Sequence, residues 1–238
     1  MNRAKQIVAA IVIVFHLWLF GQLYQHSTQH NKEFQTAWSQ QRQAVADGKS
    51  TKIVMPGLLL DQTDLRELLP IASKLTELDL MGVQVDHRTI SACTHLRILH
   101  LRSVVGDEQI SALAQLRELE VLDLPLATGV TDAGLKALAG HPKLRLVRLR
   151  APLVTDAGLI AFTQLPELRW LHLIEVPLTD AGLDVFRQLP KLESLYLDGD
   201  RATDDGLSAL ILARPDLHFH RDQVHLSTDP KSQDGHSD

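Results

Sequence analysis

Apolar and polar residues alternate along most of the chain with two different periods. At Leu171 and Leu173 the apolar residues lie two positions apart, which is the pattern of a short β-strand with one buried face. Between such strands they recur every three residues, as at Leu159 and Phe162, which predicts one buried face of a helix. The pattern therefore predicts an α/β fold in which short strands and helices alternate.

This alternation repeats at a nearly constant interval. A Thr-Asp-(Ala/Asp)-Gly-Leu pentapeptide recurs every 24 residues, at 131–135, 155–159, 179–183 and 203–207. The central strand position recurs as Leu78, Leu99, Leu122, Val147, Leu171 and Leu195. We expect a full unit around each of these positions, with edge strands at 53–55 and 217–220. Because no unit can bury both of its apolar faces alone, the units must stack into a solenoid.

Each residue of the pentapeptide has an expected role at the start of a helix. Thr155 is placed to cap the helix, and Asp156 lies in the first turn, where the helix dipole favours a negative charge. Gly158 is predicted to let a neighbouring unit approach closely. Pro166 and Pro190 end their helices and lead the chain toward the next strand.

The pentapeptide, followed by Leu-x-x-Leu-Pro-x-Leu-x-x-Leu-x-Leu, resembles the cysteine-containing subclass of leucine-rich repeats, which occurs in F-box proteins and in many bacterial proteins. The resemblance covers 75–220 and is strongest over 131–212. It implies a leucine-rich-repeat solenoid shaped like a horseshoe, with a parallel concave sheet and convex helices. It also implies a protein-binding module without catalytic activity.

The chain departs from this subclass at two characteristic positions. Where the subclass has cysteine before proline, this chain has His141, Leu165 and Leu189. The second position, three residues after the last strand leucine, is occupied by Val83, Val104, Ala127, Pro152, Val176 and Asp200. We therefore expect backbone groups or water, rather than a ladder of these side chains, to bond the loop backbone.

The N-terminal segment predicts a membrane anchor. Residues 1–6 carry Arg3 and Lys5, and residues 7–24 form an apolar run without a formal charge. As a helix this run would span about 27 Å, close to the roughly 30 Å hydrocarbon core of a bilayer. A cleaved signal peptide and a buried soluble helix are the alternatives. The two basic residues predict a single-pass membrane protein with a cytoplasmic N-terminus and extracytoplasmic repeats.

Three further segments complete the predicted organisation. Residues 25–50 are polar, and their amphipathic pattern predicts a short helix that is either a stalk or a cap on the first repeat. The repeat domain occupies 51–226. Residues 227–238 are polar, contain Pro230 and Gly235, and are predicted to form a disordered tail.

Strand positions between the leucines line the concave face of such a solenoid, so neighbouring side chains can be listed in rows. The first row is Glu77, Ile98, Val121, Leu146, Trp170 and Ser194. The second row is Asp79, His100, Asp123, Arg148, His172 and Tyr196. The third row is Met81, Arg102, Pro125, Arg150, Ile174 and Asp198.

These rows predict a partner-binding surface, because apolar residues beside Trp, Tyr and Arg are typical of interface hot spots. The candidate residues are Ile98, Val121, Leu146, Trp170, His172, Tyr196, Arg148 and Arg150. The alternative is a sheet face whose large residues simply fit a pleated surface. His100 lies between Asp79 and Asp123, which adds the hypothesis of a pH-sensitive face.

Other candidate chemistry is weaker. Cys93 aligns with the buried helix face, and no nucleophile elbow or phosphate-binding loop occurs. His218 and His220 share a strand face near Asp222 and His225, but the spacing implies no complete ligand set, so we expect a polar terminal cap and not a zinc site. The Asp of each pentapeptide is explained by helix-start chemistry rather than by calcium.

Composition narrows the class of protein further. Hydrophobic residues make up 45% of the chain, and 24 Lys+Arg against 29 Asp+Glu give a net charge of −5, so we expect an ordered fold and no nucleic-acid partner. No cofactor, metal or small-molecule substrate is expected. The sequence predicts a membrane-anchored module that binds a protein partner through its concave face. The alternatives are a structural or assembly factor of a membrane complex and a cell-wall or carbohydrate binder.

Overall fold

The computed structural model describes residues 32–59, 65–82 and 86–222, with the side chains of 56–59 excepted. The predicted anchor at 7–24 and the predicted tail at 227–238 lie outside these residues. Within the described part of the chain, no helix has the length and apolar character needed to cross a membrane.

Short strands alternate with short helices, as the sequence pattern predicts. The strands are β1 (Lys52–Leu59), β2 (Glu77–Met81), β3 (Ile98–Arg102), β4 (Val121–Leu124), β5 (Leu146–Arg150), β6 (Trp170–Ile174), β7 (Ser194–Asp198) and β8 (His218–Arg221). The helices between them are η1 (Leu65–Lys74), α2 (His87–Ala92), α3 (Asp107–Leu113), α4 (Asp132–Leu138), α5 (Asp156–Leu159) with η2 (Ile160–Gln164), α6 (Asp180–Arg187) and α7 (Asp204–Ala213). A further helix covers residues 32–46.

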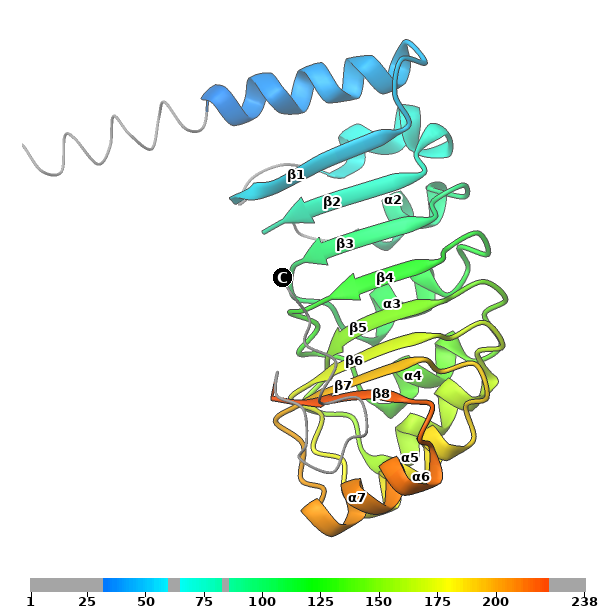
Figure 1. Cartoon of the computed structure of the whole chain (residues 1–238). Coiled ribbons are helices and arrows are strands. Elements are labelled where there is room, and N and C mark those ends of the chain that lie inside the picture. The colour runs from blue at the N-terminus through cyan, green and yellow to red at the C-terminus, as the bar shows by residue number, and fades with distance from the viewer. Residues whose placement is uncertain (1–31, 60–64, 83–85, 223–238) are drawn as a thin grey trace, which may run out of the picture.

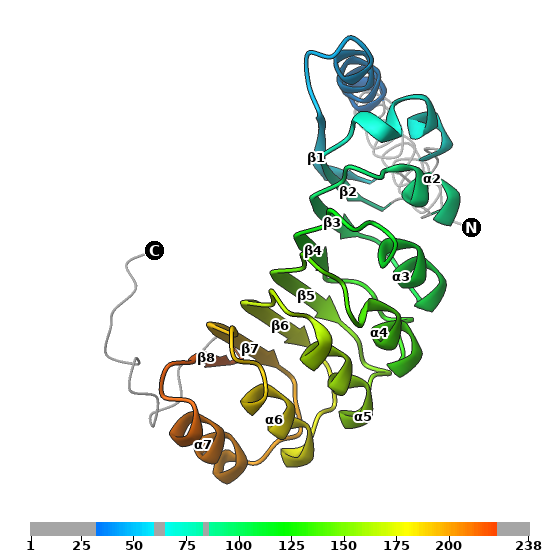
Figure 2. The same ribbon diagram turned by 90° about the vertical axis from the view of Figure 1, so that its right-hand side faces the viewer.

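The strands form one parallel sheet in the order in which they occur along the chain (Figure 1). The sheet curves, with its strands on the concave side and the helices α2 to α7 on the convex side (Figure 2). The register pairs each central position with the next, for example Leu122 with Val147 and Val147 with Leu171. These residues are buried, so the core lies between the sheet and the helices.

Three predicted boundaries are wrong, and the smallest error is in the last strand, which spans His218–Arg221 instead of 217–220. The first strand extends to Leu59 instead of ending at Met55, with a register shift after Met55. Pro125 does not belong to the third concave row, because β4 ends at Leu124 and its pairing with β5 ends at the same residue. A proline has no N–H to donate to a neighbouring strand, which accounts for the early end of β4.

Successive units are joined by a side-chain ladder that the sequence pattern did not predict. Asp132 Oδ1 accepts a hydrogen bond from the Thr155 backbone N–H (2.8 Å), and Oδ2 accepts one from the Thr155 hydroxyl (2.7 Å). The same pair of bonds joins Asp107 to Thr131, Asp156 to Thr179 and Asp180 to Thr203. We call Asp107, Asp132, Asp156 and Asp180 the aspartate ladder.

The pentapeptide threonine and glycine complete this ladder. Thr155 Oγ1 accepts a hydrogen bond from the Ala157 N–H, so the predicted helix cap is confirmed. A Cβ on Gly158 would overlap the carboxylate of Asp132. The predicted close approach is therefore also confirmed, and the group that approaches is the ladder aspartate of the preceding unit.

The helix at 32–46 packs on the first strand. Trp38 is 1% exposed, and its indole N–H donates to Glu67 Oε2 at 2.9 Å. The Gln41 side-chain amide donates to the Val54 carbonyl at 3.0 Å and accepts from the Val54 N–H at 2.8 Å. Gln41 thereby satisfies backbone groups on the free edge of β1, which would otherwise be open to pairing with another strand. Residues 32–46 thus act as a cap.

The last units use different side chains to bond the loop backbone. The Arg214 guanidinium donates to the carbonyls of Phe186, Leu189 and Leu192 at 2.9–3.0 Å. In the middle of the solenoid, the buried His141 ring donates from Nε2 to the Leu116 carbonyl at 2.9 Å. Burial lowers the pKa of His141 and so favours its neutral form. His141 is a structural residue.

Candidate functional site

The rows predicted for the concave face are neighbours in the structure. Ile98 pairs with Val121, Val121 with Leu146, and Leu146 with Trp170, as the strand spacing predicts. We call these residues the apolar stripe. Trp170 is 39% exposed, whereas the other members are half-buried. Trp170 is therefore the most exposed member of the apolar stripe, which ends at Ser194, a buried residue.

A charged row runs beside the apolar stripe. His100 Nδ1 lies 3.0 Å from Asp123 Oδ2, and Arg148 Nη1 lies 3.6 Å from Asp123 Oδ1. His100 and Asp79 are register partners, but the Asp79 carboxylate accepts from Arg102 Nη1 at 2.6 Å. The register confirms that His100 lies between Asp79 and Asp123, but the His100 ring contacts the Asp123 carboxylate, whereas the Asp79 carboxylate is bonded to the Arg102 guanidinium.

Asp123 is buried at the centre of this row. It is 8% exposed, and among the described residues its Oδ1 atom accepts no hydrogen bond. The Nε of Arg148 likewise has no hydrogen-bond partner there. A buried carboxylate oxygen without a hydrogen bond has a desolvation cost, which a nearby positive charge only partly offsets.

The predicted arginine Arg150 is engaged within the chain. Its Nε and Nη2 atoms donate to the two carboxylate oxygens of Glu175 at 2.8 and 2.6 Å. Glu175 lies in the loop after β6 and has a positive φ of 54°. A partner that bound the Arg150 guanidinium would have to compete with the Glu175 carboxylate for it.

Aromatic and imidazole rings gather at the C-terminal end of the concave face. Tyr196 stacks on His220, with centroids 4.6 Å apart and ring planes at 11°. His172 lies 5.5 Å from Tyr196, and His218 lies 6.0 Å from it on another side. We call these four residues the imidazole–aromatic cluster. His172 Nε2 is also 2.7 Å from Asp198 Oδ2, which fixes that ring.

Only half of this cluster belongs to the predicted binding surface. His172 and Tyr196 were predicted binding residues, whereas His218 and His220 were assigned to a polar terminal cap. The register pairs Ser194 with His218 and Tyr196 with His220, so both histidines continue the concave rows. Two steps of the 24-residue period lead from Trp170 to His218 and from His172 to His220, so the sequence alone is sufficient to place both histidines on the concave face.

Among the described residues, metal-ligand clusters and the cysteine thiol were the remaining candidates for reactive chemistry. No group of three or more His, Cys, Asp or Glu side chains among them is arranged to hold a metal ion. Cys93 is buried, its Sγ lies 3.4 Å from the Thr89 carbonyl, and burial raises the pKa of its thiol to about 12. The thiol is therefore protonated at neutral pH, as expected of a small buried apolar side chain.

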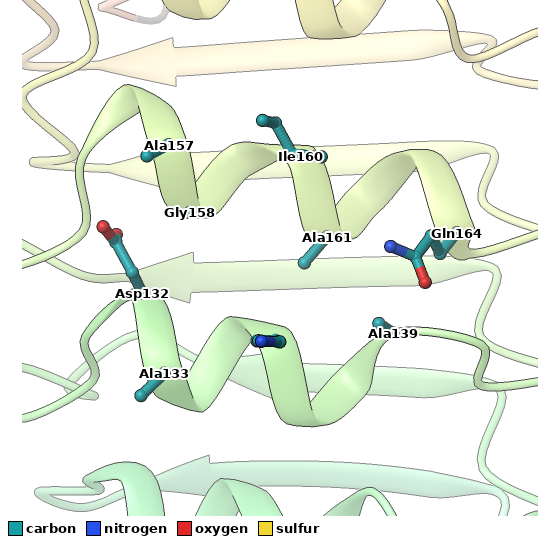
Figure 3. A pocket seen from close by; sticks show the side chains of 9 residues that line it. Asp132, Ala133, Ala139, Ala157, Gly158, Ile160, Ala161 and Gln164 are labelled. Carbon is teal, nitrogen blue, oxygen red and sulfur yellow. The ribbon is translucent and has the colours of Figure 1, made fainter.

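A shallow groove lies on the convex side between α4 and the α5–η2 segment (Figure 3). It has a volume of about 300 Å³ and is lined mainly by small side chains, with Asp132 at one end and Gln164 at the other. Asp132 already bonds Thr155 within the chain. The groove lacks the aromatic side chains found on the concave face, and Lys136 is the basic residue in its lining.

Solved structures with a similar fold are internalins. An internalin of Listeria monocytogenes (inlF) is 20% identical, with a TM-score of 0.55, and the match covers 79% of this chain and 52% of that structure. The fold is that of a leucine-rich-repeat solenoid. A second internalin from the same organism (inlC2) is 17% identical, with a TM-score of 0.45, over 69% of this chain and 80% of that one. This chain spans about half the length of the first internalin. No protein-family description and no curated relative matches the sequence.

Proposed function

We propose that this chain is a binding module that captures a protein partner on the concave face of its leucine-rich-repeat solenoid and performs no catalysis. The observation that carries the proposal is Trp170, which is 39% exposed on the sheet and continues the apolar stripe beside His172 and Tyr196. Trp and Tyr dominate interface hot spots because they bury a large area and lose little side-chain entropy.

The sheet supports such binding without rearrangement. Each concave side chain is mounted on a strand that pairs with neighbours, and the ladder and core fix the strands relative to one another. A partner would then meet a surface that is already ordered, which lowers the entropic cost of association. We expect the partner to place an apolar segment along the apolar stripe and to contact the rings of the imidazole–aromatic cluster.

The proposal includes membrane anchoring by residues 7–24, with the N-terminus in the cytoplasm and the repeats outside it. The support is the length of the apolar run and the position of Arg3 and Lys5 before it. We also assign the repeats to the cysteine-containing subclass, on the strength of the pentapeptide. A reporter that is active only in the cytoplasm, fused after Asp238, should be inactive; an active fusion would contradict this topology.

A matched pair of variants tests the binding face. Trp170→Ala combined with Tyr196→Ala should abolish partner capture from solubilised membranes while leaving the circular dichroism spectrum unchanged. The control combines Ile160→Ala with Leu212→Ala, which removes convex side chains that are 55% and 81% exposed. Proteins captured by the wild type and by the control, but not by the concave variant, are the specific partners. Equal capture by both variants would reject the concave face.

Deletion of residues 1–31 distinguishes the proposed binding module from an assembly factor that works through its membrane anchor. This cut keeps the capping helix at 32–46, in which Trp38 is buried. A binding module truncated there would still capture its partner in solution, whereas a factor that works through its anchor would not.

The exposed Trp170 beside Tyr196 also favours a second candidate, a carbohydrate ligand, because aromatic side chains stack on sugar rings. Binding to a glycan array that disappears in the concave double variant would support this candidate over a protein partner.

A further inference from the structure

The last strand carries two histidines on one face. His218 and His220 are separated by Phe219, whose side chain points into the core and is fully buried. The imidazoles are half-buried on the concave side, where β8 is the terminal strand of the sheet (Figure 1). Their ring centroids lie 4.6 Å apart, and their ring planes are inclined at 68°.

The two rings converge at their tips. His218 Nε2 and His220 Nε2 are 2.9 Å apart. Metal–imidazole bonds are about 2.0–2.1 Å long, so two ligands at 90° around one ion have nitrogens about 2.9 Å apart, whereas tetrahedral ligands need about 3.3 Å. The separation fits two adjacent positions of a square-planar or tetragonal ion, a geometry that Cu²⁺ and Ni²⁺ adopt with nitrogen and oxygen ligands.

We propose that His218 and His220 chelate a Cu²⁺ ion through their Nε2 atoms, with Ni²⁺ as a weaker substitute. In the metal-free chain the 2.9 Å contact places a hydrogen on one Nε2 atom. On metal binding that ring adopts the tautomer with hydrogen on Nδ1, so both Nε2 lone pairs face the ion. The ion then lies to one side of the line between the two Nε2 atoms, about 2.0–2.1 Å from each, and the shared hydrogen has moved to Nδ1.

Neighbouring groups orient this pair. The Tyr196 ring stacks on His220 at 11° and restricts its rotation. His172 is the other nearby imidazole, and its Nε2 is bound to Asp198. Asp222 Oδ1 accepts from the Gly199 N–H at 2.9 Å. The described residues offer no third ligand, so among them the remaining positions are open to water or to an oxygen of a bound molecule.

Copper titration of the full-length chain, produced without a polyhistidine tag, tests the site. One Cu²⁺ should bind per chain more tightly than Ni²⁺ or Zn²⁺, and its electron paramagnetic resonance spectrum should show coupling to two imidazole nitrogens. His218→Gln and His220→Gln should each lower the affinity for Cu²⁺ at least tenfold. His95→Gln is the matched control because its exposed ring lies outside the concave face, bonded to the Ser73 carbonyl.

Each outcome bears on the proposal. Tight binding that survives in both β8 variants, or that is lost in His95→Gln, would place copper elsewhere and overturn it. The wild-type spectrum tests the proposal without the variants, so the test stands even if a variant fails to fold. Coupling to fewer than two nitrogens in that spectrum would overturn the proposal. No partner is present in this experiment, so its failure would leave the proposed protein-binding function untouched.

Discussion

The two ends of the solenoid are held together in different ways. From Asp107 to Thr203, each unit is joined to the next by the same pair of aspartate–threonine hydrogen bonds. At the N-terminal end, Asp86 instead caps its own helix, accepting from the Arg88 N–H and the Thr89 hydroxyl. There the helix at 32–46 supplies the stabilising contacts through buried Trp38 and the Gln41 amide.

This difference shows that a solenoid can be stabilised by a repeated motif or by a single cap. The motif distributes its bonds over many units, so one lost bond is a local defect. The cap concentrates its contacts on the first unit, on β1 and η1, so its loss exposes the apolar face of that unit. The N-terminal units should therefore be the first to unfold when the cap is weakened.

The largest effect is expected for Trp38→Ala. Removing this buried ring should lower the free energy of unfolding by about 3–5 kcal/mol because it deletes core contacts and leaves a cavity. Urea denaturation followed by circular dichroism measures the loss. Hydrogen exchange should show faster opening of β1 and β2 than of β6 and β7. Uniform acceleration over all strands would contradict the comparison between the two ends.

Gly158→Ala tests the ladder directly. The new Cβ would overlap the Asp132 carboxylate, so we expect a loss of about 1–3 kcal/mol in the free energy of unfolding. The same substitution in an Asp132→Ala background should be much less costly, since the overlapping group is absent. A double-mutant cycle by urea denaturation measures this coupling, and additive effects would show that the two residues do not meet.

Asp132→Asn is expected to have a smaller effect. The substituted amide can accept only one of the two Thr155 hydrogen bonds, which at this exposed position costs roughly 1 kcal/mol. Asp204 provides the matched control because it occupies the same pentapeptide position in the last unit, with its side chain 86% exposed and bonded to Arg221. Asp204→Asn should change the free energy of unfolding by less than about 0.5 kcal/mol. Equal losses would remove the special role of the ladder.

The smallest effect concerns acid stability. The Thr203 backbone N–H and hydroxyl lower the pKa of Asp180, so this contribution to stability is present above the ordinary Asp pKa of about 3.9 and is lost as the pH falls through the lowered value. Thr203→Val removes the hydroxyl and should shift the Asp180 pKa upward in a ¹³C-detected NMR titration. An unchanged Asp180 titration would show that the hydroxyl bond is not formed in solution.

Strand positions and register were predictable because each leucine spacing is imposed by burial. The core admits one apolar face per strand, so the period placed Val147 beside Leu171 without structural information. The same period also predicted the neighbours within the apolar stripe. Pro125 was wrongly placed in the third concave row because the same strand length was assumed for every unit. The missing N–H of this proline ends β4 one residue earlier.

Side-chain pairing was less predictable. The favourable charge at a helix start already explains an aspartate at each ladder position, so the sequence gives no reason to look for a second role. Only the atomic positions reveal that these aspartates bond the next unit. Arg102 bonds Asp79 although they lie in different rows, so a list of rows alone paired Asp79 with His100. Long flexible side chains reach diagonal neighbours, and strand register does not decide between those choices.

A photo-crosslinking amino acid placed at single positions shows which face of the solenoid meets the partner. Substituted at Trp170, it should crosslink one specific partner protein in intact cells, and the same product should form from Val121 on the same stripe. Substituted at Ile160 on the convex side, it should give no such product. Crosslinking of that partner from Ile160, with none from Trp170 or Val121, would contradict binding on the concave face.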